Sequence, residues 1–142
     1  MSDIRLPVIL MLEYDPDDRF ITSTVFEEQQ YQVHLEFVNN SKGLFGYLDQ
    51  CRLSNLPYPA VIVINLNITP VDGREVLKQL KANADYLHLP VVILSDAKDP
   101  KLARECYALG ASSFIQKPDA LTGTNEKIRN FFRYWFETVV LS

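Results

Sequence analysis

The segment AVIVINL, residues Ala60 to Leu66, is a run of branched apolar side chains with an asparagine near its end. Val and Ile favour strands, and a strand that is apolar along its whole length is typical of a parallel sheet covered on both faces. Two further runs have the same character, PVILML from Pro7 to Leu12 and PVVIL from Pro90 to Leu94. The sequence therefore predicts three buried central strands.

Two more segments complete the predicted sheet. In YQVHLEFV, residues Tyr31 to Val38, apolar residues alternate with His34 and Glu36, which indicates an edge strand with one exposed face. The run SSFIQ, residues Ser112 to Gln116, is short and suits the opposite edge.

Helical patterns separate these strands. Asp15-Pro16 and Asp99-Pro100 each predict a helix start with the aspartate as cap, and Gly110 is placed to end the second of these helices. Apolar residues recur at helical spacing in four segments: Leu44, Phe45, Leu48 and Cys51; Val76, Leu77 and Leu80; Leu102, Ala103, Cys106 and Leu109; and Ile128, Phe131, Phe132, Trp135, Phe136 and Val139 in a last helix from about Leu121.

Alternating strands and helices predict an α/β fold. Strand–helix–strand units have parallel strands and right-handed crossovers, so we expect a doubly wound five-stranded parallel sheet of order 2-1-3-4-5 with helices on both faces, as in flavodoxin. We expect one domain over residues 1–142, with a core from about 6 to 120 and a C-terminal helix from about 121 to 141. In such a fold ligands bind at the carboxyl ends of the central strands.

Composition narrows the possible classes of protein. The 142 residues carry 14 basic and 18 acidic side chains, a net charge of −4, which disfavours a nucleic-acid surface. No apolar run is long enough to cross a membrane and no secretory leader opens the chain, so we expect a cytoplasmic protein. Cys51 and Cys106 lack metal-binding spacing and are expected to be reduced.

Three longer stretches carry a family resemblance. In this order along the chain, they resemble the CheY-like receiver domain of two-component response regulators. The stretches are ILMLEYDPDDRFI, PAVIVINLNITPVDGREVLKQLKAN and LPVVILSDAKDPKLARECYALGASSFIQKP. The likeness runs from about residue 6 to residue 141. The ending IRNFFRYWFETVVLS is similar to the ending of small stand-alone receivers of the phytochrome-regulator type.

The resemblance implies a phosphoryl-transfer site. The family uses an Asp nucleophile after the third strand, two preceding acids that hold Mg²⁺ with it, a hydroxyl after the fourth strand and a Lys after the fifth. On this alignment Glu13 is the first acid, but the second acid position carries Tyr14 and the nucleophile position carries Asn65. Ser95 matches the hydroxyl and Lys117 matches the lysine.

Other positions of the implied pocket follow in the same way. Asn67 matches a residue whose backbone carbonyl contacts the metal, and Phe114 falls at the family's aromatic switch position. Pro118 follows Lys117 as in the family, where the bond is usually cis, and we expect Lys117 to turn into the pocket toward Asn65 or Glu13. Asp96 stands where the family prefers a small residue, and Pro70 lies one place later than the family's loop proline.

These departures predict altered chemistry. The amide of Asn65 is neutral and a poor nucleophile, so no acyl phosphate forms on it. One carboxylate, Glu13, faces one lysine, so we expect Mg²⁺ binding to be lost and no other cofactor to be needed. Asp15 is expected to cap a helix rather than replace the missing acid. We therefore expect no catalytic residue and no enzyme activity.

The sequence thus predicts a pseudo-receiver in two-component or phosphorelay signalling, a stand-alone module that acts by protein–protein contact. An alternative is phosphorylation on a non-standard residue, Asp15 or Asp96. A flavin carrier is disfavoured, because the acidic loop EYDPDD would repel a phosphate. The expected partners are a sensor kinase or a downstream target, with no nucleic acid and no membrane. We also expect a homodimer through the last helix and the adjoining edge of the sheet, because that helix has more apolar residues than one stripe against the sheet needs. The expected interface residues are Phe132, Tyr134, Trp135 and Phe136.

Overall fold

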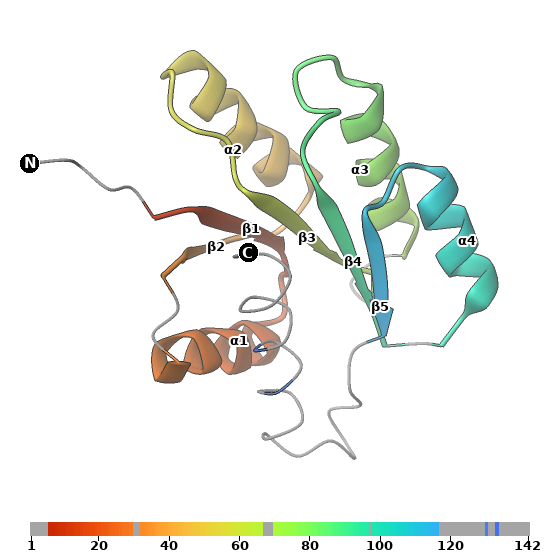
Figure 1. Ribbon diagram of the computed structural model, residues 1–142, viewed down its shortest axis with the longest axis horizontal. Coiled ribbons are helices and arrows are strands. Elements are labelled where there is room, and N and C mark those ends of the chain that lie inside the picture. Colours follow the sequence, from red (N-terminus) through yellow and green to blue (C-terminus); the bar gives the residue numbers. More distant parts are fainter. Residues whose placement is uncertain are drawn as a thin grey trace, which may run out of the picture.

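Five parallel strands form one sheet, with a helix between each pair of consecutive strands (Figure 1). The computed structural model describes residues 6–29, 32–66, 70–96 and 98–116, together with residues 130 and 133. The strand order is β2-β1-β3-β4-β5, which confirms the predicted doubly wound fold. The elements are β1 (Val8–Leu12), α1 (Pro16–Gln29), β2 (His34–Val38), α2 (Ser41–Leu53), β3 (Val61–Asn65), α3 (Pro70–Ala82), β4 (Val91–Ser95), α4 (Pro100–Ala108) and β5 (Ser113–Gln116).

The two faces of the sheet have separate apolar cores. On one face, side chains of β1, β3 and β4 pack with α2, α3 and α4, through residues such as Leu48, Leu77 and Cys106. On the other face, alternate residues of the same strands pack with α1, through Phe26. Each strand residue of β3 and β4 is buried. Burial on both faces explains why these strands are apolar at every position.

The edge strand β2 has the predicted alternation. Leu35 and Phe37 pack against the α1 side of the sheet. His34 and Glu36 are exposed and pair with each other, with 2.8 Å between His34 Nε2 and Glu36 Oε2. The strand is shorter than predicted and begins at His34, where the backbone N–H of His34 donates to the Pro7 carbonyl at 2.8 Å.

Helix ends follow the predicted signals. The Asp15 carboxylate accepts hydrogen bonds from the backbone N–H groups of Asp17 at 2.8 Å and Asp18 at 3.3 Å. The Asp99 carboxylate accepts from Lys101 and Leu102, both at 3.1 Å, and Pro100 occupies the first turn of α4. Both predicted caps are therefore confirmed.

Two glycines are required by geometry. Gly110, at a φ of +108°, follows α4 in a backbone conformation that side chains rarely adopt, as its predicted role as terminator requires. Gly73 faces the end of β3, where an added Cβ would lie 2.4 Å from Leu66 Cδ2. Helix α3 therefore lies close to the carboxyl end of β3, and a larger residue at position 73 would push it away.

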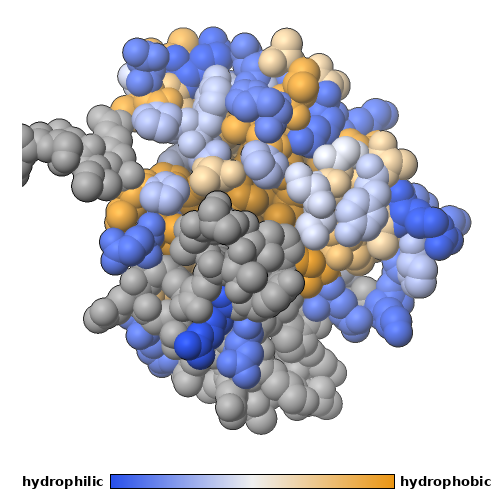
Figure 2. All heavy atoms as spheres, viewed as in Figure 1, coloured by the Kyte–Doolittle hydropathy of each residue, from blue (hydrophilic) through white to orange (hydrophobic). Residues whose placement is uncertain are grey.

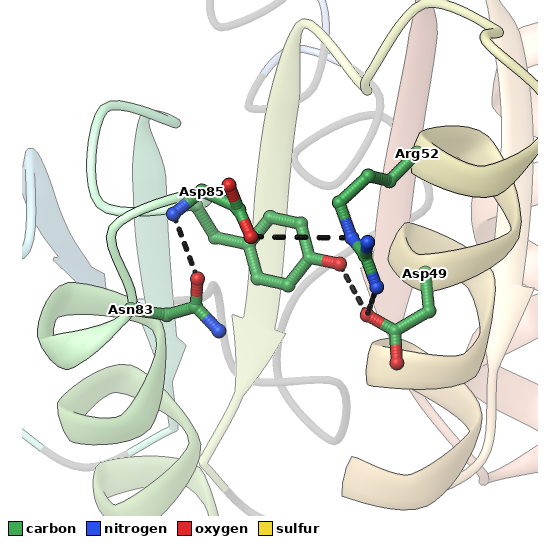
Figure 3. A network of polar contacts seen from close by, with 5 residues as sticks. Asp49, Arg52, Asn83 and Asp85 are labelled. Carbon is green, nitrogen blue, oxygen red and sulfur yellow. Dashed lines mark hydrogen bonds and ion pairs between the residues drawn. The ribbon is translucent and has the colours of Figure 1, made fainter.

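A polar network joins α2 to the loop between α3 and β4 (Figure 3). Tyr86 is 1% exposed, and its hydroxyl donates to the Asp49 carboxylate of α2. The guanidinium of Arg52 lies 3.9 Å from both Asp49 and Asp85. The carboxamide of Asn83 accepts from the Asp85 N–H at 2.8 Å. Burial, followed by the hydrogen bond to Asp49, raises the pKa of Tyr86.

Several sequence-based expectations fall on residues that the structure does not describe. They are the last helix from about residue 121 and the proposed interface residues Phe132, Tyr134, Trp135 and Phe136.

On the face drawn in Figure 2, hydrophilic residues cover the outer sides of the described helices, and hydrophobic residues show between them, beside the sheet. Among the described helices, none has the length and apolar character needed to span a membrane.

The variant Tyr86→Phe should lower the free energy of unfolding by about 1–2 kcal/mol, because it removes a hydrogen bond to a carboxylate and keeps the buried ring. Urea unfolding at pH 7 measures the loss. Tyr58→Phe is the matched control, since the Tyr58 ring packs edge-on against Tyr86 at 5.6 Å and that contact is retained.

The same interaction has a pH signature. Since the pKa of Tyr86 is raised from 10.0, the folded state holds the phenol proton more tightly than the unfolded state does. The resulting stability is fully present below about pH 10 and is lost as the pH rises above it. Equal pH dependence of Tyr86→Phe and the parent protein between pH 9 and 11 would contradict this assignment.

Candidate functional site

The strand register brings the predicted pocket residues together at the carboxyl edge of the sheet. Leu12 of β1 lies opposite Ile64 of β3, so Glu13 and Asn65, one residue further along each strand, stand level. Ser95 ends the next strand, β4. The exposed fractions are 0% for Glu13, 2% for Asn65 and 2% for Ser95. Three polar side chains are thus buried side by side at strand ends.

A hydrogen bond joins the first two of them. Asn65 Nδ2 donates to Glu13 Oε1 across a distance of 2.5 Å. The other carboxylate oxygen, Oε2, accepts from the Asp15 backbone N–H at 3.3 Å. A buried carboxylate is costly unless it accepts hydrogen bonds, and a bond to a charged group contributes about 1.5–3 kcal/mol. We call this contact the Glu13–Asn65 pair.

The backbone of Glu13 is also fixed. Its N–H donates to the Val38 carbonyl of β2 at 3.0 Å, which extends the strand ladder by one residue. Its carbonyl accepts a hydrogen bond from Arg19 Nε of α1. Arg19 Nη2 donates to the Asn39 side chain in the loop after β2, and its guanidinium lies 5.1 Å from the centre of the Phe37 ring.

Sequence reasoning missed Arg19. The available signal was its position four residues after the cap Asp15, where its own N–H donates to the Asp15 carbonyl at 3.0 Å. A basic side chain in the second turn of α1 lies beside the acidic loop, but the loop after β2 is twenty residues away in the chain. Only the parallel pairing of β1 with β2 brings the two loops together.

The remaining described pocket residues lie at the rim or to the side. Tyr14, at the second acid position, is 55% exposed, whereas the Glu13–Asn65 pair is buried. Asp96 is exposed. Phe114 is half-buried on β5 and packs against the core on the α4 side, where its backbone N–H donates to the Tyr107 hydroxyl at 3.0 Å.

Three predicted pocket residues lie outside the described part of the chain: Asn67, Lys117 and Pro118. The expected orientation of Lys117 and the expected cis bond before Pro118 therefore stay predictions. Pro70, which the sequence places one residue late, is the first residue of α3.

The doubly wound sheet, with buried polar side chains at the carboxyl ends of β1, β3 and β4, defines the class of protein. The model of the response regulator receiver domain matches residues 9–129. The chain belongs to this family, whose members are signalling proteins of two-component systems rather than enzymes as a rule.

Particular relatives resemble the chain over almost its full length. The response regulator Rcp1 of Synechocystis sp. is 28% identical over 144 residues, which cover 99% of this chain and 98% of Rcp1. The crystal structure of the Mn²⁺-bound form of Rcp1 has a TM-score of 0.77 at 27% identity and covers 96% of this chain and 99% of that one. The response regulator RPA3017 in red light signaling of R. palustris has a TM-score of 0.76 at 28% identity, with 94% and 96% covered.

Two substitutions at Asp15 separate its cap from a role as a replacement acid. Asp15→Ala should lower the free energy of unfolding by about 1 kcal/mol, whereas Asp15→Asn should change it by less than about 0.5 kcal/mol, because an amide oxygen still accepts from the helix N–H groups. Thermal or urea unfolding measures both. A loss in Asp15→Asn as large as in Asp15→Ala would show that the charge, and not the cap, is what position 15 supplies.

Proposed function

We propose that this chain is a pseudo-receiver, a signalling module that works by protein–protein contact and takes no phosphoryl group on the family's acceptor position. The observation that carries the proposal is Asn65 itself. It stands at the end of β3, where the family places its Asp, and its amide donates to Glu13. The side-chain amide of Asn65 is neutral and therefore a poor nucleophile, unlike the carboxylate of an aspartate. Its nitrogen is also engaged in the hydrogen bond to Glu13.

The described pocket also fits a divalent cation poorly. Mg²⁺ takes six oxygen ligands and is usually held through carboxylates. Here Glu13 Oε1 faces the N–H donor of Asn65, and the second acid position carries Tyr14, which is 55% exposed. With Lys117 in the pocket, as the resemblance implies, Glu13 is balanced by one positive charge. The pocket then has no excess negative charge to attract a cation.

The alternative acceptors are also poorly placed. Asp15 is committed to the first turn of α1, where its Oδ1 accepts from two backbone N–H groups. Asp96 follows β4 and is exposed. Neither aspartate lies at the end of β3, so neither takes the place of the missing nucleophile. These positions favour a receiver fold that contacts partners through its surface but does not take up a phosphoryl group.

Incubation of the protein with a small phosphodonor and Mg²⁺ should give no phosphate adduct by intact mass, and titration with Mg²⁺ in the millimolar range should show no binding. The reason is the absence of a strand-end nucleophile together with a single pocket carboxylate. A phosphate adduct that maps to Asp15 or Asp96 would support the alternative of a non-standard acceptor and sink the proposal.

Two variants serve as positive controls for the same measurement. Asn65→Asp combined with Tyr14→Asp should restore Mg²⁺ binding, because the pocket would then contain three carboxylates. Asn65→Asp alone should restore less, because one of the metal's carboxylates is still absent. Equal Mg²⁺ affinity in the parent protein and the double variant would show that these two positions do not account for the change.

We also propose that the chain pairs with a second copy through its last helix, as the surplus of apolar residues there suggests. Light scattering at micromolar concentration should give the mass of a dimer. The variants Phe132→Asp and Phe136→Asp should shift it to the monomer, because a buried charge opposes association. A monomeric parent protein, or a dimer that tolerates both changes, would refute this interface.

A further inference from the structure

Arg19 joins three parts of the molecule at the carboxyl end of β1, although the family resemblance gives it no role. Its Nε donates to the Glu13 backbone carbonyl, and its Nη2 donates to the Asn39 side chain. The face of the guanidinium lies over the Phe37 ring, 5.1 Å from its centre. A planar guanidinium is suited to this task, because it presents donors in two fixed directions and a flat face for stacking.

One of these contacts is made to Glu13, the residue whose side chain accepts a hydrogen bond from Asn65. The Glu13 backbone is fixed on one side by its N–H bond to Val38 and on the other by Arg19. Its side chain then reaches Asn65 across the sheet. The Arg19 contact holds the peptide after Glu13, and so it fixes the path of the chain to Asp15. The Asp15 backbone N–H donates to Glu13 Oε2, so Arg19 constrains the Glu13–Asn65 pair through this loop donor.

We propose that Arg19 is a positioning residue that presets the acidic loop of this receiver without a metal ion. The relative Rcp1 has been crystallised in a Mn²⁺-bound form. In this chain a permanent positive charge on α1 fixes the loop from its backbone side, and the Asn65 amide fixes it from the pocket side. The loop therefore has one geometry whether or not divalent cations are present.

The inference deepens the proposed function and rests on it in one respect. If the pocket binds no cation and takes no phosphoryl group, then the loop is fixed only by the protein's own groups, and the surface around it is offered to partners in a constant form. Arg19 would then maintain the signalling conformation rather than support catalysis.

A double-mutant cycle tests whether Arg19 acts through Glu13. The single variants are Arg19→Gln and Asn65→Ala, which remove groups from opposite sides of Glu13, and urea unfolding is followed in a metal chelator. We expect the effect of Asn65→Ala on the unfolding equilibrium constant to be at least about threefold smaller in the Arg19→Gln background, as is typical of residues in one network. Arg104→Gln is the matched control, because Arg104 is exposed on α4, and it should be additive with Asn65→Ala within about twofold.

A second measurement reports on geometry rather than stability. The Asp15 backbone N–H donates to Glu13 Oε2, so its hydrogen-exchange protection should fall in Arg19→Gln and stay unchanged in Arg104→Gln. Additive effects of Arg19→Gln and Asn65→Ala, or unchanged protection of the Asp15 amide, would overturn the inference. If Arg19→Gln does not fold, Arg19→Lys replaces it, since lysine keeps the charge but loses the planar pair of donors.

The two proposals can fail separately. The cycle is measured in chelator and without phosphodonor, so an additive result removes the role of Arg19 and leaves the absence of phosphorylation intact. A phosphate adduct in the mass experiment would refute the proposed pseudo-receiver function. It would not affect a measured coupling between Arg19 and Asn65.

Discussion

The hydrogen bond from Asn65 to Glu13 is the interaction on which the described site depends. It joins the ends of β1 and β3, two of the three central strands, at a place where both side chains are almost fully buried. A carboxylate in that position must be neutralised or supplied with donors. The amide supplies one donor and brings no further negative charge to the strand ends.

The rest of the architecture positions this contact. Apolar strands covered on both faces fix the register, since a shift by one residue would exchange the residues that face the α1 core with those that face the α2, α3 and α4 core. The close approach of α3 at Gly73 leaves little room for the side chain of Leu66, the residue after β3, to move sideways. At the other end of the sheet, Tyr86 and Asp49 tie α2 to the loop before β4. The strand ends are therefore held by packing beside the site, at Gly73, and by contacts at the opposite edge of the sheet.

The pseudo-receiver proposed above would separate two properties of the receiver family. The fold supplies a surface of defined shape, whereas the pocket of an ordinary receiver supplies a chemical switch. Over the described residues the sheet and four helices are formed, and Arg19 and Asn65 each donate a hydrogen bond to Glu13. A protein of the proposed kind suits a signalling step in which occupancy by a partner, and not modification, carries the information.

Local apolar patterns and cap geometry within a few residues were enough to predict the sheet order, the strand positions and both aspartate caps. The same strand pattern placed Glu13, Asn65 and Ser95 at strand ends, and the family resemblance supplied the roles expected of them. The three-dimensional structure was needed to show that Asn65 donates to Glu13. It also showed that Arg19 donates hydrogen bonds to the Glu13 backbone carbonyl and to the Asn39 side chain. Those contacts join residues from 6 to 52 positions apart, and side-chain partners at such separations are set by strand register and helix packing, which no local pattern specifies.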